Sequence, residues 1–248
     1  MIYLFYFYKL LIVKEKQMDW YYEGERRPEN WKNICEAFKK AENESLQSPI
    51  QLCEQSAKKN QYQKTMNTRY HLTNFETSFF NHTVHLTPLS GQEVNVLFFN
   101  HKRYILDDIH FHLPSEHQIN HESFPLEMHL VHRSKENDLL VLAIMVIPNK
   151  EPANLEKSRL DSLALNPRVS GRGLLVPVDV AKLLPIKKQF FHYTGSLTTP
   201  PTIGPVNWVV FKNQTYMRKG LLQAFKENVG KTNRPLQPLG NRTIYLSE

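Results

Sequence analysis

Two short stretches of alternating apolar and polar residues most constrain what this chain can fold into. Residues 108–113 read Asp-Ile-His-Phe-His-Leu, and residues 126–133 read Leu-Glu-Met-His-Leu-Val-His-Arg. Alternation with a period of two is typical of β-strands whose two faces meet different surroundings. The interruptions at 114–120 and 123–125 contain prolines and polar residues. The sequence therefore predicts two strands separated by a connecting segment.

Histidines gather on one face of each predicted strand. On the first strand, Asp108, His110 and His112 share a face, and on the second, Glu127 and His129 share a face. Antiparallel pairing of these strands would bring the imidazoles together. An isolated His-X-His pair is more often a surface or core pair than a metal site. With Glu-X-His on the next strand, metal binding and an ordinary surface or core cluster become equal alternatives.

A set of three imidazoles is the ligand set of a catalytic zinc site. Structural zinc sites are closed by four protein ligands, whereas three ligands leave the fourth position to water. We therefore predict that His110, His112 and His129 bind Zn²⁺. Glu127 is placed to accept a hydrogen bond from the free ring nitrogen of His129, which would fix its tautomer and raise its basicity.

Four sequence blocks resemble the α-class carbonic anhydrases, especially their bacterial branch. They are Ile-His-Phe-His-Leu-Pro-Ser-Glu-His-Gln at 109–118, Glu-Met-His-Leu-Val-His at 127–132, Tyr-Thr-Gly-Ser-Leu-Thr-Thr-Pro-Pro at 193–201 and Val-Asn-Trp-Val-Val-Phe at 206–211. The blocks occur in the order and spacing of that family. The resemblance extends over nearly the whole chain, from Trp20 to Arg242.

The resemblance implies a zinc-dependent enzyme that catalyses reversible hydration of carbon dioxide to bicarbonate and a proton. Zinc held by neutral ligands lowers the pKa of its water to about 7, and the resulting hydroxide attacks carbon dioxide. Weak esterase activity and binding of sulfonamide or anion inhibitors are expected of such a centre. The alternative is a noncatalytic binding module, because some proteins with this fold have lost their zinc ligands.

The resemblance also assigns roles around the zinc ion. Thr198 is expected to accept a hydrogen bond from the hydroxide and to donate its own to Glu116. Asp108 stands where the family usually has the glutamine that bonds the first zinc histidine. An ionised Asp108 would still accept that bond and would raise the pKa of the zinc water.

Carbon dioxide is small and apolar, so its site needs an apolar wall more than polar anchors. By periodicity alone, the residues that match this wall would be assigned to the core. The residues expected to bind substrate are Val131, Val141, Leu197, Thr198, Thr199, Val206 and Trp208.

A proton must leave the site in each turnover, and histidine carries protons near neutral pH. Residues 80–86 read Phe-Asn-His-Thr-Val-His-Leu and resemble the family stretch Asn-Gly-His-Thr-Ile-Gln-Val. The match places His82 at the proton-shuttle position and His85 at a polar cavity position. Because Asn81 replaces a common glycine, His85 is the alternative shuttle.

The remaining patterns predict a strand-dominated fold. An apolar run at 139–147 is typical of a central strand buried on both faces. Further strands are expected at 69–74, 78–86 and 93–99, and helical segments at 31–40, 154–163, 178–184 and 220–229, with a loop at 167–173. The resemblance implies a large twisted, mostly antiparallel sheet with short peripheral helices.

Charge and length indicate one basic domain. The net charge is +7, but no Lys/Arg block of five or more occurs in the 248 residues. A solvated basic surface is therefore favoured over nucleic-acid binding. With no internal repeat or low-complexity linker, we expect a single domain over residues 18–248.

Cysteine content and the N-terminus bear on location. The chain has two cysteines, Cys35 and Cys53, and Thr202 occupies the position of the partner cysteine in bacterial relatives. The usual disulfide therefore cannot form, although a Cys35–Cys53 pair stays open. Unpaired thiols fit a reducing compartment, so we expect a cytoplasmic protein, with a periplasmic one as the alternative.

The first 13 residues are apolar and aromatic, yet this segment is too short for an ordinary membrane span. It also lacks the basic start and small-residue cleavage site of a signal peptide. We interpret residues 1–17 as an extension upstream of a true start at Met18. A poorly formed export segment or membrane anchor is the alternative.

Overall fold

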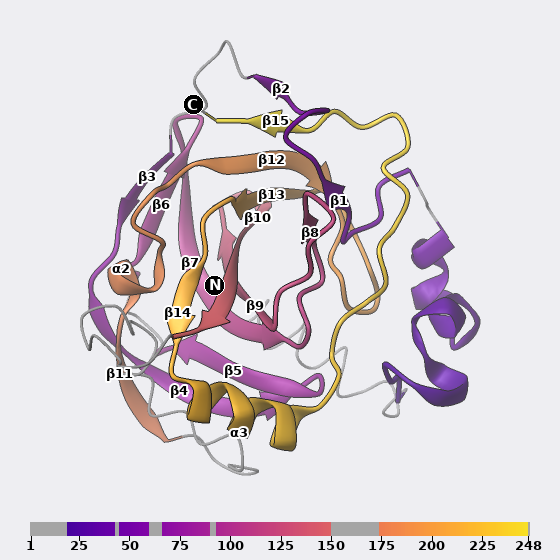
Figure 1. Cartoon of the computed structure of the whole chain (residues 1–248), viewed down its shortest axis with the longest axis horizontal. Coiled ribbons are helices and arrows are strands. Elements are labelled where there is room, and N and C mark those ends of the chain that lie inside the picture. Colours follow the sequence, from indigo (N-terminus) through magenta and orange to yellow (C-terminus); the bar gives the residue numbers. More distant parts are fainter. Residues whose placement is uncertain (1–18, 43–44, 60–65, 90–92, 150–173, 248) are drawn as a thin grey trace.

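A large twisted, mixed β-sheet dominates the structure (Figure 1). The computed structural model describes residues 19–42, 45–59, 66–89, 93–149 and 174–247. The predicted mainly β class with few helices is confirmed. Three strand pairings of this sheet are parallel, β10–β13, β10–β14 and β15–β2, and the other pairings are antiparallel.

Four neighbouring strands form the centre of the sheet. In order across it they are β7 (Lys102–His112), β9 (Leu126–Arg133), β10 (Leu139–Pro148) and β13 (Val206–Phe211). The apolar run in β10 is buried on both faces, as predicted for a central strand.

The remaining strands extend the sheet on both sides of this centre. On the β7 side lie β5 (Thr83–Pro88), β4 (Leu72–Phe80) and β11 (Leu175–Asp179), with β6 (Val96–Phe99) and β3 (Met66–Arg69) as a branch. On the β13 side lie β12 (Phe190–Gly195), β15 (Tyr245–Leu246) and β2 (Lys58–Lys59), and β14 (Thr215–Met217) pairs with β10. A separate two-stranded sheet contains β1 (Gln51–Leu52) and β8 (Gln118–Ile119).

Alternation along the central strands divides the core into two clusters. Leu142 and Ile144 of β10 pack in one cluster with Phe111 of β7. Val141 and Ala143, between and beside them in sequence, pack in the other. Successive side chains on a strand point to opposite faces, and full burial of each large apolar side chain contributes about 1.5–3 kcal/mol. The polar residues that alternate with Phe111 therefore face the second cluster.

Helical segments are short and peripheral. They are α2 (Val180–Leu183), α3 (Lys219–Val229) and the 3₁₀ helices η1 (Gly24–Arg26), η2 (Pro28–Asn33) and η3 (Glu36–Glu42). Helix α3 confirms the helix predicted at 220–229, and its Phe225 ring packs 5.0 Å from the ring of Phe111. No helix in the described part of the chain combines the length and apolarity needed to cross a membrane.

Several predicted boundaries were wrong. The single helix predicted at 31–40 is replaced by parts of η2 and η3, and the helical turn at 178–184 is limited to α2 after the end of β11. The strand predicted at 93–99 is limited to β6, and that at 69–74 spans the end of β3 and the start of β4. The helix and loop predicted at 154–163 and 167–173, like the extension at 1–17, lie outside the described residues.

The strand predicted at 78–86 is interrupted by a tight turn. Asn81 and His82 have φ angles of 45° and 66°, and they join β4 to β5. Positive φ at both central positions matches the twist of a hairpin, and asparagine tolerates this region better than most residues. His82 therefore lies at a hairpin tip rather than within a strand.

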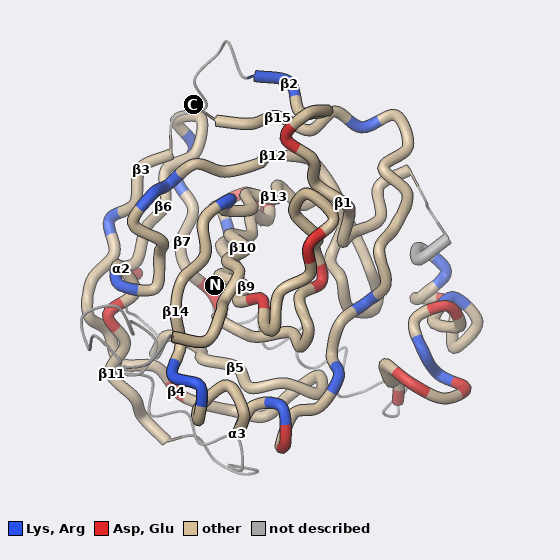
Figure 2. Tube along the Cα trace, viewed as in Figure 1, with Lys and Arg blue, Asp and Glu red and all other residues tan. Residues whose placement is uncertain are grey.

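Charged and sulfur-containing side chains are dispersed. Lys and Arg occur on separate elements around the trace, interspersed with Asp and Glu (Figure 2).

Cys35 and Cys53 are both half-buried free thiols, and Thr202 is buried. The Cys35–Cys53 pairing that the sequence left undecided is therefore not formed in this structure.

Candidate metal and catalytic site

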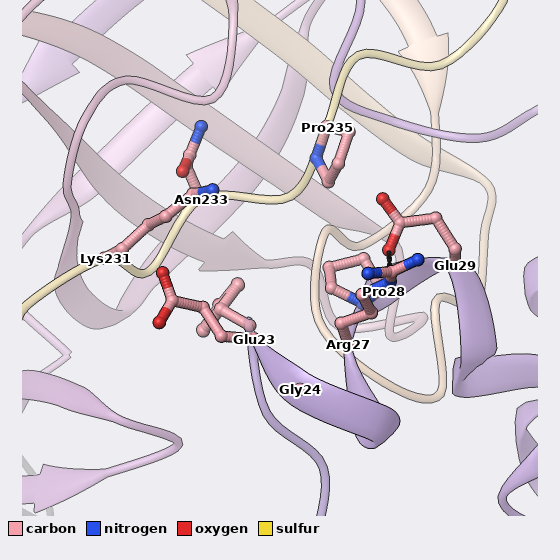
Figure 3. Close-up of a pocket in the computed structure, with 9 residues that line it drawn as sticks. Glu23, Gly24, Arg27, Pro28, Glu29, Lys231, Asn233 and Pro235 are labelled. Atoms are coloured by element: carbon pink, nitrogen blue, oxygen red, sulfur yellow. Dashed lines mark ion pairs between the residues drawn. The ribbon is translucent and has the colours of Figure 1, made fainter.

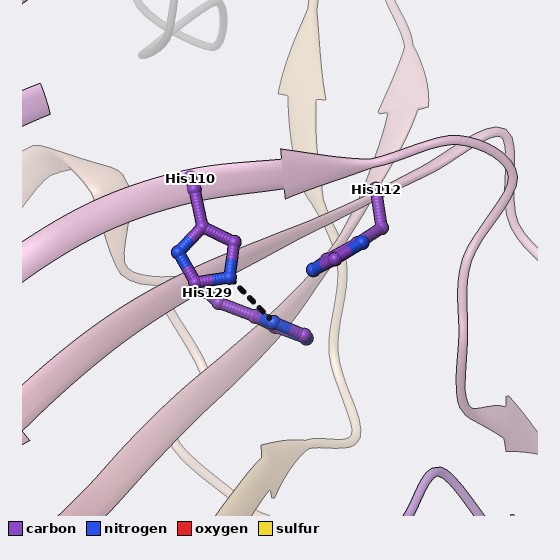
Figure 4. A group of neighbouring side chains, drawn as sticks. All are labelled: His110, His112 and His129. Carbon is purple, nitrogen blue, oxygen red and sulfur yellow. Dashed lines mark hydrogen bonds between the residues drawn. The ribbon is translucent and has the colours of Figure 1, made fainter. Parts of the chain in front are cut away.

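Adjacent strands bring the three predicted ligands together. His110 of β7 lies directly opposite His129 of β9, and His112 follows two residues along β7 on the same face. Figure 4 shows the three rings pointing toward one another from these two strands. Directly opposed residues have Cβ atoms about 4.5–5.5 Å apart, so imidazoles on them readily meet.

One nitrogen of each ring faces the space between the rings. His110 Nε2 and His129 Nδ1 are 3.3 Å apart. Two ligands about 2.0–2.1 Å from zinc at a tetrahedral angle would lie about 3.3–3.4 Å apart. His112 Nε2 is buried without a hydrogen-bond partner within the described structure. Three converging nitrogens, one of them unsatisfied, fit a bound metal ion.

The other nitrogen of each ring is fixed by an oxygen of the protein. The three donor–acceptor pairs are His110 Nδ1 to Asp108 Oδ2 (2.6 Å), His112 Nδ1 to the Thr232 carbonyl (2.6 Å) and His129 Nε2 to Glu127 Oε1 (2.8 Å). Such bonds select the tautomer and orient the ring toward a metal. Both carboxylates were expected from the sequence, whereas Thr232 was not, because a backbone carbonyl leaves no residue-type signal.

Burial keeps these imidazoles neutral. It lowers the pKa of His110 and of His129 to about 4 and that of His112 to about 3. Neutral imidazole is the form that binds a metal. Burial alone would raise the pKa of Glu127, but the charge and hydrogen bond of His117 and the bond from His129 hold it well below its usual range.

A second histidine holds Glu127 from behind. His117 Nδ1 donates to Glu127 Oε1 at 2.7 Å, and the backbone N–H groups of Glu116 and His117 donate to Oε2 at 2.8 Å each. His117 Nε2 lies 2.7 Å from the hydroxyl oxygen of Tyr193. We did not assign His117 from sequence, although it lies within the first motif. Its buried contacts make Glu127 a rigid acceptor for His129.

Glu116 and Thr198 lie beside the histidines. Glu116 Oε1 accepts the backbone N–H of Arg234 at 2.9 Å, and Oε2 lies 3.6 Å from His112 Nε2. Burial and the charge of Glu127 raise the pKa of Glu116, and a hydrogen bond from Thr198 opposes this rise. Oε2 forms no hydrogen bond in the described residues. The structure therefore brings together the expected Thr198–Glu116 pair.

The expected apolar wall adjoins the third histidine. Val131, Val141 and Trp208 are register partners across β9, β10 and β13, and the Trp208 ring lies 5.0 Å from the His129 ring. The five wall residues belong to one apolar cluster, in which Val141, Val206 and Trp208 are buried and Val131 and Leu197 are partly buried. Thr199 is half-buried beside Thr198.

The two candidate shuttles lie in different surroundings. His82 Nε2 donates to the Trp20 carbonyl at 2.6 Å, and the two ring centroids lie 4.9 Å apart. His85 is the register partner of His110, and its Nδ1 lies 3.0 Å from both Asp108 oxygens. The structure thus connects His85, and not His82, directly to a predicted ligand.

A separate cavity of about 260 Å³ lies between the N-terminal 3₁₀ helices and the C-terminal segment (Figure 3). Its lining includes Arg27, which is paired with Glu29 at 3.2 Å, and Lys231. The predicted metal ligands are not part of its lining. The cavity is therefore distinct from the group of three histidines.

Known proteins share both the sequence and the fold. The sequence profile of eukaryotic-type carbonic anhydrases matches residues 26–248. A carbonic anhydrase of Neisseria gonorrhoeae is 33% identical, covering 91% of this chain and 86% of that protein. The α-carbonic anhydrase of Thermovibrio ammonificans, solved with the inhibitor sulfanilamide, gives a TM-score of 0.79 at 30% identity, covering 93% and 99% of the two chains. A dioscorin solved with ascorbate gives 0.77 at 27% identity, covering 92% and 97%.

Proposed function

Because the chain belongs to the α-carbonic anhydrase family, we propose that it is a zinc-dependent enzyme that hydrates carbon dioxide reversibly to bicarbonate. The observation that carries this proposal is the convergence of His110 Nε2, His112 Nε2 and His129 Nδ1, each on a ring fixed by an oxygen acceptor. A donor set of neutral nitrogens leaves the full charge of the metal ion available for Lewis-acid chemistry.

His110, His112 and His129 would hold the ion. When bound, zinc supplies a Lewis acid that lowers the pKa of a coordinated water to about 7. The thiol of Cys53 takes no part, because it contacts His121 and Gln51 instead of the three histidines.

The chain's own side chains then orient the reaction. The Thr198 hydroxyl donates to Glu116 and therefore presents its lone pairs as the acceptor for the attacking oxygen nucleophile. This directs the nucleophile's remaining lone pair toward the substrate. The apolar side chains of Val141 and Trp208 exclude water from the place where carbon dioxide would lie.

The dioscorin relatives motivate the alternative, a noncatalytic binding module. The three imidazoles, Glu116 and Thr198 are all present and adjacent in this chain, which supports catalysis instead. A stopped-flow assay of carbon dioxide hydration with a metal analysis of the same sample distinguishes the two. We expect about one zinc per chain and hydration well above the buffer rate. A fully zinc-loaded protein without hydration would favour the binding module.

We further propose that His82 carries the released proton from the site to buffer. Histidine side chains can accept and release protons near neutral pH. In dilute buffer, His82→Ala is expected to lower kcat about tenfold or more. kcat/KM for carbon dioxide should stay near the wild-type value, because hydration precedes proton exit. Added imidazole should restore kcat.

The matched variant is His85→Ala. His85 bonds to Asp108, the acceptor for His110, so its loss is expected to lower kcat/KM as well as kcat, through a changed ligand environment. If His82→Ala behaves as wild type while His85→Ala loses only kcat and is rescued by imidazole, the shuttle is His85.

A further inference from the structure

Arg234 is a buried arginine whose guanidinium bonds to no carboxylate in the described residues. Only 3% of its surface is exposed, and within the described residues its guanidinium forms no ion pair. Burial lowers its pKa to about 10, so it remains charged at neutral pH. Its Nη1 donates to Gln47 Oε1 at 2.6 Å and to the Ser48 carbonyl at 2.8 Å. A buried charge is costly unless it is compensated, and here these two acceptors and the Trp31 ring, 5.6 Å from the guanidinium carbon, compensate it.

The two residues that carry these acceptors, Gln47 and Ser48, also bond to the loop that carries Thr198, on both sides of that threonine. Ser48 exchanges two hydrogen bonds with Ser196, from Ser48 N to Ser196 Oγ at 3.0 Å and from Ser196 N to Ser48 Oγ at 3.1 Å. Gln47 Nε2 donates to the Thr202 carbonyl at 3.3 Å. The guanidinium therefore acts on the loop at positions before and after Thr198.

The backbone of Arg234 contacts Glu116, the expected hydrogen-bond partner of Thr198. The Arg234 N–H donates to Glu116 Oε1 at 2.9 Å. Two residues earlier, the Thr232 carbonyl accepts from His112. The segment around Arg234 thus contacts Glu116 directly through its backbone and the Thr198 loop indirectly through its side chain.

We propose that Arg234 is a positioning residue that sets the Thr198 hydroxyl against the Glu116 carboxylate, because its guanidinium holds the Thr198 loop and its backbone N–H holds Glu116. This inference rests on the proposed function. A displacement of about 1 Å in a reacting arrangement can lower a rate about 100-fold. Loss of the guanidinium would free the loop while leaving the backbone bond to Glu116 in place.

The test is Arg234→Met in the zinc-loaded, full-length protein. Methionine keeps much of the apolar stem but leaves Gln47 Oε1 and the Ser48 carbonyl without this donor. We expect kcat/KM to fall about 10- to 100-fold, with unchanged zinc content. Arg234→Lys, which keeps the charge and can reach one acceptor, should recover part of the loss. The control is Arg69→Met, because Arg69, at the end of β3, packs over the Phe98 ring instead.

Two further measurements separate positioning from a general loss of stability. In a Thr198→Ala background, Arg234→Met should change kcat/KM less than about threefold, because coupled residues are not additive. Amide hydrogen exchange should increase at Ser196 in Arg234→Met and not in Arg69→Met, since the Ser196 N–H donates to Ser48. An equal Arg234→Met effect in both backgrounds, or unchanged exchange at Ser196, overturns the inference. Hydration absent even from zinc-loaded wild-type protein refutes the proposed function instead, and the exchange measurement still tests the inference.

Discussion

His129→Ala is expected to abolish zinc binding and carbon dioxide hydration together. The substitution removes one of three converging nitrogens and leaves only His110 and His112. Loss of an outer acceptor alone typically costs 10- to 100-fold in metal affinity, so loss of a ligand should exceed about 100-fold. Metal analysis after dialysis should find less than about 0.1 zinc per chain, against about one in the wild-type protein.

His129 is buried and bonds to Glu127, so its loss also affects folding. Circular dichroism and thermal unfolding must therefore accompany the metal analysis. His112→Ala removes a different ligand and leaves the hydrogen bond between His129 and Glu127 in place. His71→Ala is the matched control, because His71 is exposed and lies outside the histidine motifs in the sequence. A folded His129→Ala protein that retained stoichiometric zinc and activity would contradict the assigned ligand set.

Thr198→Ala should keep zinc and lose most of the hydration rate. In the proposed mechanism the hydroxyl donates to Glu116 and accepts from the nucleophile, so its removal deletes the acceptor that would orient the nucleophile. Removing one preorganised hydrogen-bonding group in comparable sites costs about 100- to 1,000-fold in kcat, equivalent to about 2.7–4 kcal/mol. Stopped-flow hydration assays at matched zinc content measure this loss directly.

Thr194→Ala is the control for that substitution. Thr194 is an exposed threonine at the end of β12, four positions before Thr198. It should retain the wild-type rate. If Thr198→Ala loses zinc, the threonine has a structural role at the metal site. If it keeps both zinc and rate, the Thr198–Glu116 pair does not orient the nucleophile.

Local pattern was enough to predict the ligand-bearing strands. His110 and His112 share a face because strand periodicity is two, and that periodicity is visible in six residues of sequence. The register that opposes His110 to His129 could not be read from the pattern alone. The family resemblance supplied the remaining expected residues, and the structure brings Glu116 and Thr198 together beside them.

Contacts over long sequence separations were not predictable. The Thr232 carbonyl lies 120 positions from His112, and the Arg234 side chain bonds to Gln47 across 187 positions. Neither contact depends on a local pattern, and one involves a backbone atom that any residue would offer. The hairpin at His82 was missed because both of its strands have similar alternation, so the turn residues resembled a continuous strand.

The most direct test of the account is zinc titration of the metal-free protein. Protein stripped with a chelator should hydrate carbon dioxide no faster than buffer. Added zinc should restore activity linearly and reach a plateau at about one equivalent per chain, as expected for one three-histidine site. The same titration of folded His129→Ala should stay flat. Full hydration activity in the metal-free wild-type protein would contradict the account.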